Sequence, residues 1–519
     1  MCQPQHRSAV FEDERCIFPG IASAKHSRLF FGIKARASTG NDSADFLAGV
    51  IEGFYGQPWT IDERVDLFGR MAQWGLNTYL YAPKDDLKHR ALWRERYSNA
   101  EASRLREIIR ECNRRKIRFI YALAPGLDIQ YARGSERARL KARFKQMLGL
   151  GCQHFALLFD DIPDRMDPND IARWGSLASA QCHVTNTMFR WTREQNAVAV
   201  FLFCPTPYCG RMAARKLGGR NYLEIIGRDL LPEIDVFWTG PEIISREITV
   251  EHIRGLQKII RRKPVIWDNL HANDYDGRRF FCGPYTGRPL ELRHEVRGLL
   301  SNPNNDYALN EIPLRTLAQF VFAKRIWDPR KAYLSAMRDW LPRFQTVTRH
   351  ISFEDLVLFG DCFYLPHEEG PEAEKLYKQI VALVAEEPRQ SKQIARCRSD
   401  IARLRNVCAQ ISELKDRRLF YALSRRIWDL REELDLLNGY LEFRANKNNA
   451  NAESRSDFHL PGTFRGGMIS RLQRLLTLRR DGTFVTGQGV KMAEQNSATS
   501  GAGPVGEVKK HRQSLSSVT

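Results

Sequence analysis

Two aspartates, Asp160 and Asp161, stand side by side at the end of an apolar run, in the stretch LLFDDIPD at residues 157–164. Like charges at this range raise the pKa of one member of a carboxyl pair, which gives an acid beside a base. Glycoside cleavage needs both roles, but ordinary glycosidases hold their two carboxyl groups on opposite sides of the scissile bond. Adjacent carboxylates fit better when the nucleophile is a 2-acetamido oxygen of the substrate. One aspartate would then steer the amide N–H while the other protonates the leaving oxygen.

Further polar and aromatic residues follow other apolar runs, at the point where each run ends. They are Glu52 to Gly56 (EGFYG), Lys84 to Asp86 (KDD), Tyr208, Trp267 to Asn269 (WDN) and Asn273 to Tyr275 (NDY). Carboxylates and amides hydrogen-bond the hydroxyl groups of a sugar, and aromatic rings stack on its apolar face. Because the carboxyl ends of the strands carry the active site in a parallel barrel, we expect these residues on one rim. The set therefore favours a sugar site.

Other interpretations of the same residues stay open. Lys84 at a strand end could form a Schiff base, which would make the protein a lyase. The four aspartates after the second and fourth runs could instead hold a divalent cation; they are Asp85, Asp86, Asp160 and Asp161. A pair of aspartates at a strand end also often caps a helix, although two prolines separate this pair from the next helical pattern. We rank glycosidase first, metal-dependent hydrolase second and lyase third.

The elements that must position these residues alternate between apolar runs and amphipathic helical patterns. The runs that predict strands are FLAGVIEGF (46–54), NTYLYAP (77–83), IRFIYALAP (117–125), HFALLFD (154–160), VAVFLFCP (198–205), IDVFWTG (234–240) and PVIWDN (264–269). Apolar strands separated by helices are typical of a parallel sheet covered on both faces. The pattern predicts a (β/α)8 barrel over residues 46–325. We expect the eighth strand after Asn302, within 305–318.

Helical patterns predict the helices between the strands and those that follow residue 325. IDERVDLFGRMAQWG (61–75) predicts a helix with its apolar face on Ile61, Val65, Phe68 and Ala72. Beyond residue 325 the strand pattern stops, and DPRKAYLSAMRDWLPRF (328–344) predicts a helix with a proline in its first turn. Helical spacing continues through the following hundred or so residues. These patterns predict an all-α domain over 326–445 that packs on the barrel as a small bundle.

The ends of the chain and the composition narrow the class of protein. Residues 1–45 predict a poorly ordered N-terminal extension, and 446–519, rich in Asn, Ser and Gly, predict a mostly disordered tail. No apolar run is long enough to cross a membrane, and the N-terminus does not resemble a secretory signal. The 11 cysteines include no C-x-x-C pair and no Cys/His cluster, which is typical of free thiols in a reducing compartment. We therefore expect a cytoplasmic protein without a membrane partner.

The formal net charge of +19 raises the question of a nucleic-acid partner. The basic residues are spread over helical surfaces such as SRLREIIRECNRRKIR (103–118), and no stretch interleaves a basic stripe with aromatic residues. A solvated basic surface explains this pattern better than a groove for DNA or RNA. We expect no nucleic-acid partner.

Five blocks carry a more specific resemblance. GVIEGFYGQPW (49–59), NTYLYAPKDDLKHR (77–90), FALLFDDI (155–162), FLFCPTPYCG (201–210) and VIWDNLHANDYD (265–276) resemble glycoside hydrolase family 84, which includes the protein O-GlcNAcases. The resemblance covers about 46–305 and leaves both tails outside. It implies a (β/α)8 barrel without metal or other cofactor. It also implies a retaining β-N-acetylglucosaminidase whose substrate forms an oxazoline through its own acetamido group.

The resemblance assigns roles to individual residues. Asp160 matches the carboxylate that orients and polarises the acetamido N–H, and Asp161 matches the general acid that then acts as base on water. Positions that bind the hydroxyl groups and the acetamide fall on Gly53, Lys84, Asn269, Asp274 and Asn302. Pocket-wall positions fall on Tyr208 and Trp267, and Tyr275 follows the Asp274 position. For Tyr55 and Asp268 a structural role is at least as good an explanation.

The group that carries the sugar stays open at this level. A glycoprotein with N-acetylglucosamine on Ser or Thr, a free glycan and a hyaluronan-like chain all present the same terminal residue. A non-catalytic sugar-binding protein on the same barrel is the alternative outside enzymes. The helical domain could form part of a peptide groove, mediate a homodimer or brace the barrel.

Overall fold

The computed structural model describes residues 46–163, 165–385, 391–445, 467–478 and 484–487. The predicted N-terminal extension, 1–45, lies outside the described residues. Of the predicted disordered tail, 446–519, the structure describes a short helix, α16 (Gly467–Gln473), and a hairpin of β9 (Leu476–Leu478) and β10 (Phe484–Thr486). In α16, Met468, Ile469 and Leu472 bury apolar side chains.

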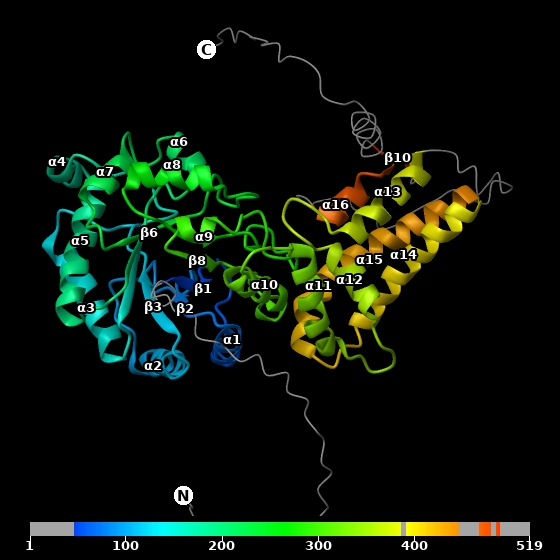
Figure 1. Cartoon of the computed structure of the whole chain (residues 1–519), viewed down its shortest axis with the longest axis horizontal. Coiled ribbons are helices and arrows are strands. Elements are labelled where there is room, and N and C mark those ends of the chain that lie inside the picture. Colours follow the sequence, from blue (N-terminus) through cyan, green and yellow to red (C-terminus); the bar gives the residue numbers. More distant parts are fainter. Residues whose placement is uncertain (1–45, 164, 386–390, 446–466, 479–483, 488–519) are drawn as a thin grey trace, which may run out of the picture. The chain divides into compact units, whose positions relative to one another are not determined.

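Eight parallel strands close into a barrel in the order of the chain, as the sequence predicts (Figure 1). The strands are β1 (Leu47–Glu52), β2 (Thr78–Tyr81), β3 (Arg118–Leu123), β4 (His154–Leu158), β5 (Phe201–Cys204), β6 (Asp235–Trp238), β7 (Val265–Asp268) and β8 (Gly298–Ser301). The barrel closes where β1 pairs with β8, with Leu47 opposite Gly298 and Val50 opposite Ser301. Seven strands fall inside the predicted runs. The (β/α)8 architecture is therefore confirmed.

The eighth strand lies earlier than predicted. It is the four-residue segment GLLS at 298–301, whereas the range 305–318 holds a short 3-10 helix (Tyr307–Leu309) and most of helix α10 (Glu311–Phe322). Only Leu299 and Leu300 are large apolar residues here, between Arg297 and Ser301, so the local signal was weak. Pairing with β7 and β1 on both sides makes GLLS a strand, which is a tertiary effect.

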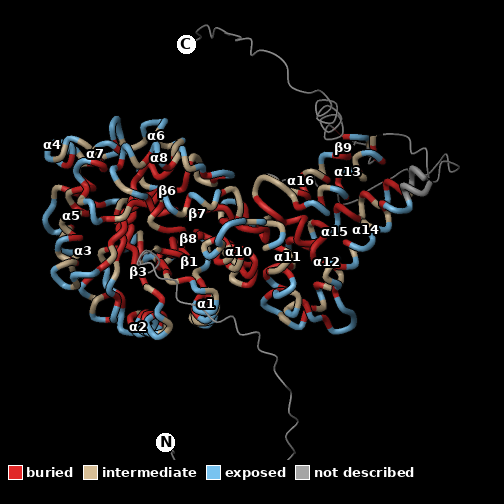
Figure 2. Tube along the Cα trace, in the orientation of Figure 1, coloured by how far each residue is buried: buried red, intermediate tan, exposed pale blue. Residues whose placement is uncertain are grey.

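Ten helices surround the strands and connect them. They are α1 (Ile61–Trp74), α2 (Asn99–Arg114), α3 (Gly134–Gly149), α4 (Pro168–Trp174), α5 (Leu177–Gln195), α6 (Gly210–Ala214), α7 (Tyr222–Asp229), α8 (Val250–Ile260), α9 (Leu292–Glu295) and α10. Capping boxes fix where α1 and α2 begin: Thr60 pairs with Glu63, and Ser98 pairs with Glu101. The helices turn buried residues toward the strands and exposed residues toward solvent (Figure 2).

The buried face of α1 differs from the predicted one. Arg64, Leu67, Phe68 and Met71 are buried, whereas Ala72 is exposed. Leu67, Phe68 and Met71 are also apolar at helical spacing, so two overlapping faces fit the sequence. Arg64 lies on the observed face because Glu52 at the end of β1 accepts from its Nε over 2.8 Å.

The remaining helices form the all-α region. They are α11 (Pro329–Trp340), α12 (Phe353–Asp361), α13 (Pro371–Ala385), α14 (Ser391–Ile411) and α15 (Arg417–Ala445). Asp328 caps α11 by accepting from the backbone N–H of Lys331 over 3.0 Å, and a proline occupies the first turn, as predicted. Arg426 of α15 donates to Asp306, which follows β8, over 2.8 Å.

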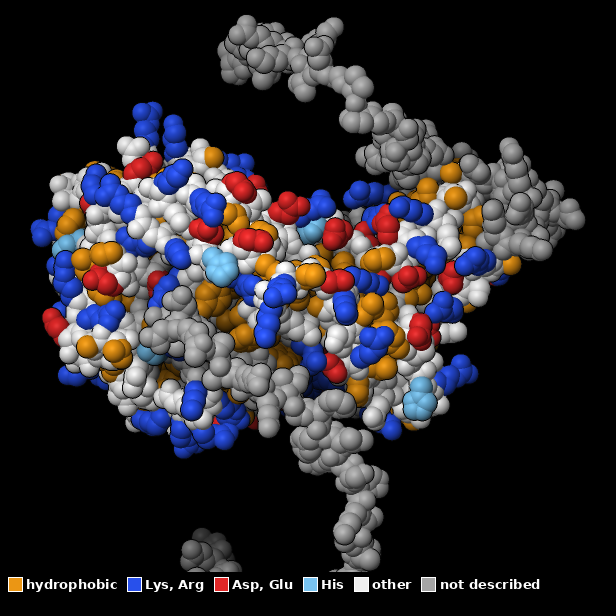
Figure 3. Space-filling model, in the orientation of Figure 1, with side chains coloured by type: hydrophobic (Ala, Val, Ile, Leu, Met, Phe, Trp, Pro, Cys, Tyr) orange, Lys and Arg blue, Asp and Glu red, His pale blue; other side chains and the backbone are white. Residues whose placement is uncertain are grey.

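The surface agrees with a solvated basic protein. On the face drawn in Figure 3, acidic side chains are interspersed among the more numerous Lys and Arg side chains. None of the described helices combines the length and apolar character that a bilayer-spanning segment requires. Nine of the 11 cysteines lie in the described part of the chain, and all nine are buried and unpaired, including Cys204 and Cys209.

Candidate active site

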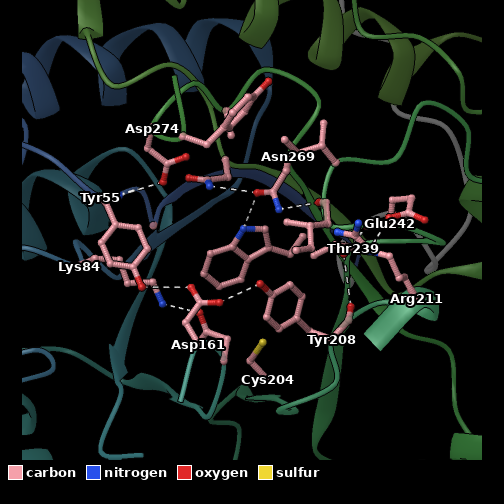
Figure 4. A pocket seen from close by; sticks show the side chains of 18 residues that line it. Tyr55, Lys84, Asp161, Cys204, Tyr208, Arg211, Thr239, Glu242, Asn269 and Asp274 are labelled. Atoms are coloured by element: carbon pink, nitrogen blue, oxygen red, sulfur yellow. Dashed lines mark hydrogen bonds and ion pairs between the residues drawn. The ribbon is translucent and has the colours of Figure 1, made fainter. Parts of the chain in front are cut away.

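A pocket of about 570 Å³ opens at the carboxyl-terminal end of the barrel (Figure 4). All ten residues that the sequence predicts for the site line it: Gly53, Lys84, Asp160, Asp161, Tyr208, Trp267, Asn269, Asp274, Tyr275 and Asn302. Trp267 lies near the end of β7, and the others follow β1, β2, β4, β5, β7 and β8; they meet because parallel strands all end on one rim. The structure brings the whole predicted set together, and the individual roles stay predictions.

Asp160 is held by a buried cation. The Lys84 ammonium forms an ion pair with Oδ2 of Asp160, and the two side chains are 2% and 8% exposed. Burial by itself would lower the pKa of Lys84, but the charges of Asp160 and Asp161 outweigh it and raise the pKa above its ordinary value. The lysine therefore stays protonated. The second oxygen of Asp160, Oδ1, is buried without a hydrogen-bond partner among the described residues, so it is available to a donor on a ligand.

Asp161 is exposed and lies between two tyrosines (Figure 4). The Tyr208 hydroxyl donates to Oδ1 over 2.8 Å, and the Tyr55 hydroxyl donates to Oδ2 over 3.1 Å. The backbone of Asp161 has φ +50°, a left-handed conformation that is uncommon outside glycine. A helix-capping role is excluded because Asp167 caps α4 by accepting from the N–H of Asn169. The carboxyl group is thus oriented toward the pocket by side chains from two other loops.

Both tyrosines keep their protons. Burial raises the pKa of Tyr208, and the neighbouring charge of Asp161 raises it further. Burial also raises the pKa of Tyr55, and the charge of Asp161 adds to that rise. Neutral phenols can donate to either oxygen of Asp161 throughout the physiological range.

A network of amides forms the opposite wall. The Asn269 carbonyl oxygen accepts from the Trp267 indole N–H and from the Asn302 amide, each over 3.0 Å. Its own amide donates to the backbone oxygen of Ile243 over 2.9 Å. The Asn302 oxygen is buried without a partner among the described residues. A ligand hydroxyl could satisfy that oxygen.

Asp274 and Tyr275 complete the pocket from the loop after β7. Oδ2 of Asp274 accepts from the backbone N–H of Tyr55 over 3.0 Å. Burial raises the pKa of Asp274, and the charge of Asp161 acts in the same direction. Tyr275 is 38% exposed, and burial raises its pKa to about 12. The carboxylate and the phenol stand where hydroxyl groups of a sugar can reach them.

Gly53 is required by a close approach. A Cβ atom at this position would lie 2.5 Å from Cζ2 and 2.9 Å from Cη2 of Trp267. The Trp267 ring packs edge-to-face on Phe237, with ring centroids 5.3 Å apart, and cannot retreat freely. The missing side chain of Gly53 therefore sets the position of the indole wall.

Comparison with known proteins decides the family. A sequence model of beta-N-acetylglucosaminidase matches residues 48–352. The chain belongs to this family, glycoside hydrolase family 84. The Protein O-GlcNAcase of Rattus norvegicus is 48% identical over 302 residues, which are 58% of this chain and 33% of the rat protein. That of Mus musculus is 47% identical over 287 residues, 55% of this chain and 31% of the mouse protein. The chain thus spans about a third of the length of these curated relatives.

Solved structures agree with the fold. A mutant of the O-GlcNAc hydrolase of Thermobaculum terrenum superposes with a TM-score of 0.69 at 28% identity, over 78% of this chain and 85% of that one. The structure of CpGH84B superposes with a TM-score of 0.67 at 23% identity, over 78% and 70% of the two chains, and shows the fold alone.

The geometry of this family-84 site argues against the rival chemistries. Asp85 accepts from the Gly56 N–H over 2.9 Å, and Asp86 accepts from the Tyr81 hydroxyl over 2.8 Å, so neither turns toward Asp160. Within the described ranges, no three His, Cys, Asp or Glu side chains are placed to hold a metal ion. A Schiff base needs a neutral amine, whereas the Lys84 ammonium is paired and its pKa is raised.

The sequence left the roles of two residues, Asp268 and Tyr55, undecided, and the structure gives them different surroundings. Asp268 is buried in an ion pair with Arg288, at 2.7 Å, and also accepts from the Tyr285 hydroxyl over 2.7 Å, so its role is structural. Tyr55 lines the pocket and contacts Asp161, so it belongs to the site.

Sequence reasoning missed one side of the pocket. Its other lining residues are Cys204, Arg211, Thr239, Glu242, Ile243, Ile244 and Ala272. The segment TGPEII (239–244) follows β6, so the rule that strand ends carry the site could have found it. Glu242 in this segment is a carboxylate after a strand end, which is the signal that indicated the other site residues.

Proposed function

We propose that this chain is a retaining β-N-acetylglucosaminidase that works by substrate assistance and removes O-linked N-acetylglucosamine from Ser and Thr of proteins. The observation that carries the proposal is the arrangement of Asp160 and Asp161. One presents a buried oxygen without a partner beside a lysine, and the other is exposed and held by two phenols. The two adjacent carboxyl groups therefore have different environments and suit different roles.

In the first step, Asp160 accepts the acetamido N–H of the substrate, and this polarises the amide. The acetamido oxygen forms a bond to the anomeric carbon while the bond from that carbon to the leaving oxygen breaks. Asp161 gives its proton to the leaving oxygen, which departs as a Ser or Thr hydroxyl. The products are an oxazolinium ion, whose ring N–H donates to the Asp160 carboxylate, an Asp161 carboxylate and the released hydroxyl compound.

In the second step, Asp161 acts as base. It takes a proton from water as the water oxygen bonds to the anomeric carbon, and the bond from that carbon to the oxazoline oxygen breaks. The acetamido group is restored, and Asp161 is protonated again. Two displacements at one carbon retain its configuration.

The protein substrate is supported by the relatives, which are named Protein O-GlcNAcase. Buried, unpaired cysteines in the described part of the chain agree with a cytoplasmic location. A homodimer through the helical region and domain limits at 46–325 and 326–445 stay part of the proposal. Sedimentation velocity measures the first, and limited proteolysis measures the second.

Separate substitution of the two aspartates tests the mechanism. Asp161→Asn should lower kcat/KM by about 10²–10⁴-fold on an alkyl N-acetylglucosaminide but far less on an aryl glycoside with a good leaving group. Asp160→Asn should lower both, because acetamido participation is needed whatever leaves. A loss below about tenfold on the alkyl substrate in either variant contradicts the assignment.

Two further comparisons separate the alternatives. An unmodified protein that binds but does not turn over the aryl substrate is a sugar-binding protein, and one that loses activity in EDTA uses a metal. Activity on an O-GlcNAc glycopeptide beside an oligosaccharide of N-acetylglucosamine decides between a protein substrate and a free glycan. We expect EDTA-resistant turnover and preference for the glycopeptide.

A further inference from the structure

Arg90 makes two contacts that converge on Asp161, although it is not among the residues that line the pocket. Its Nη1 donates to the Tyr55 hydroxyl oxygen over 2.6 Å, and its Nη2 donates to the backbone carbonyl oxygen of Asp161. The guanidinium carbon also lies 5.5 Å from the centroid of the Tyr55 ring. A planar guanidinium can serve two acceptors at once in fixed directions, which an ammonium group cannot do.

The contact between Arg90 and the Asp161 carbonyl oxygen lies at a residue with an unfavourable backbone conformation. At φ +50°, the Cβ of Asp161 crowds its own backbone, so this conformation needs support from its surroundings. The bond from Arg90 to the Asp161 carbonyl oxygen provides such support. Because the backbone angle sets the direction of the Cα–Cβ bond, it also sets where the carboxyl group points.

The contact between Arg90 and Tyr55 determines where the Tyr55 hydroxyl proton points. A guanidinium can only donate, so the Tyr55 oxygen accepts from Arg90, and its own proton is left for Oδ2 of Asp161. Burial and the charge of Asp161 raise the pKa of Tyr55, while Lys84 and Arg90 oppose that rise. The phenol therefore stays a donor. The Tyr55 backbone is fixed separately, because its N–H donates to Asp274 and its carbonyl oxygen accepts from Asn305 over 2.6 Å.

We infer that Arg90 is a positioning residue for the acid–base step: it holds Asp161 in its left-handed conformation and points the Tyr55 hydroxyl at the Asp161 carboxylate. The inference rests on the proposed function, because it assigns Arg90 to the acid and base role of Asp161. The contact with the Asp161 backbone directs the Cα–Cβ bond, and the contact with Tyr55 directs a donor at Oδ2. Asp161 is the proposed base that takes a proton from water in the second step.

Other charged and titratable groups also face Asp161. They are Tyr208 after β5, Lys84 after β2, the adjacent Asp160 and Asp274 after β7. Lys84 is paired with Asp160, and Tyr208 contacts the other carboxyl oxygen, Oδ1. Among the described residues, Arg90 alone donates both to the Asp161 backbone and to the tyrosine on Oδ2.

The pH dependence of kcat/KM tests the inference. With an alkyl leaving group the first step needs a proton donor, so the basic limb of the kcat/KM profile reports the acid of the free enzyme. Arg90→Met removes a cation and the donor that directs Tyr55, so the basic limb should move to higher pH by about half a unit or more. Tyr55→Phe, which removes only the hydroxyl donor, should move the limb in the same direction. Arg90→Lys should fall between Arg90→Met and the unmodified protein.

Arg94→Met is the matched control. Arg94 lies four residues further along the chain, donates to Asp128 and Glu136, and stacks on Trp93, none of which lines the pocket. Its removal should leave the limb where it is. Thermal melting of each variant identifies a general loss of folding. If Arg90→Met does not fold, Tyr55→Phe and Arg90→Lys decide the test.

The possible failures are distinguishable. If the unmodified protein does not hydrolyse the substrate, the proposed function is wrong and the inference fails with it. If the unmodified protein is active and folded Arg90 variants keep its basic limb, Arg90 is only structural and the inference is overturned, even when kcat falls. A limb shift in Arg94→Met equal to that in Arg90→Met overturns it as well.

Discussion

The ammonium group of Lys84 lies directly against one oxygen of Asp160, and both side chains are buried at the carboxyl-terminal end of the barrel. Asp160 has no other side-chain partner in the described chain, and its second oxygen has none at all. One cation therefore holds the carboxylate that we propose for the substrate amide.

Lys84→Met should lower kcat/KM by about 10²–10³-fold on aryl and alkyl substrates alike. Removing the cation leaves Asp160 buried without compensation, so the carboxylate no longer polarises the acetamido group, which every leaving group requires. Steady-state kinetics on both substrates measure the effect. Lys88→Met is the control, because Lys88 pairs with Glu101 over 2.6 Å outside the pocket. Loss confined to the alkyl substrate would contradict the role given to Lys84.

Gly53→Ala should lower kcat/KM by about 10²-fold, because the added Cβ meets Trp267 and displaces the pocket wall. The control is Gly69→Ala in the middle of α1, where an added Cβ has no neighbour within 4 Å. That change should stabilise the protein by about 0.5–1 kcal/mol without affecting turnover. Steady-state kinetics and denaturant titration of Gly53→Ala and Gly69→Ala measure kcat/KM and the free energy of unfolding. Full activity in Gly53→Ala would show that the indole can move.

Arg288→Leu should lower the free energy of unfolding by about 3–5 kcal/mol, because it leaves the buried carboxylate of Asp268 without its cation. The two side chains are 0% and 1% exposed. Denaturant titration measures the loss. Arg254→Leu, which breaks an exposed pair with Glu295, should leave the midpoint almost unchanged. Equal effects in the two variants would mean that burial of the Arg288 pair is unimportant.

Glu433→Gln should stabilise the protein at pH 8 and have little effect near pH 4.5. Burial raises the pKa of Glu433 to about 7, although the bond from Gln473 opposes the rise, so the folded state holds this proton more tightly than the unfolded state. The contribution of Glu433 to the free energy of unfolding is fully present below pH 4.5 and is lost as pH rises through about 7. Glutamine keeps the 2.8 Å bond from Gln473 and removes the titration. The gain should be on the order of 2–3 kcal/mol.

Denaturant titrations of both proteins at pH 4.5 and 8 give the difference directly, because other titrating groups cancel. Nearby charges on the same helix, Glu432 and Asp429, act in the direction of the raised pKa. A stability difference that does not change with pH would place the Glu433 carboxylate in solvent and contradict the prediction.

The barrel and the rim of polar residues could be predicted because their signals are local. A strand buried on both faces is a continuous apolar run, and seven of the eight strands lie within such a run of the sequence. Once those runs are parallel strands, the residue after each run lies at the same end of the barrel. The positions of Lys84, Asp160 and Asp274 in one pocket follow from that rule without any knowledge of the tertiary contacts.

Only the tertiary structure decided which of these residues contact one another. Tyr55 and Asp161 are 106 residues apart, and no local pattern links them. Asp268 looked like a site residue by position, but a buried arginine from the following loop takes both of its oxygens. Strand β8 exists because its two neighbours supply hydrogen bonds on either side. The sequence by itself determines which chemical groups reach the rim, since that depends on local periodicity. Their partners, protons and strained backbone depend on contacts between distant segments, which form only when the barrel closes.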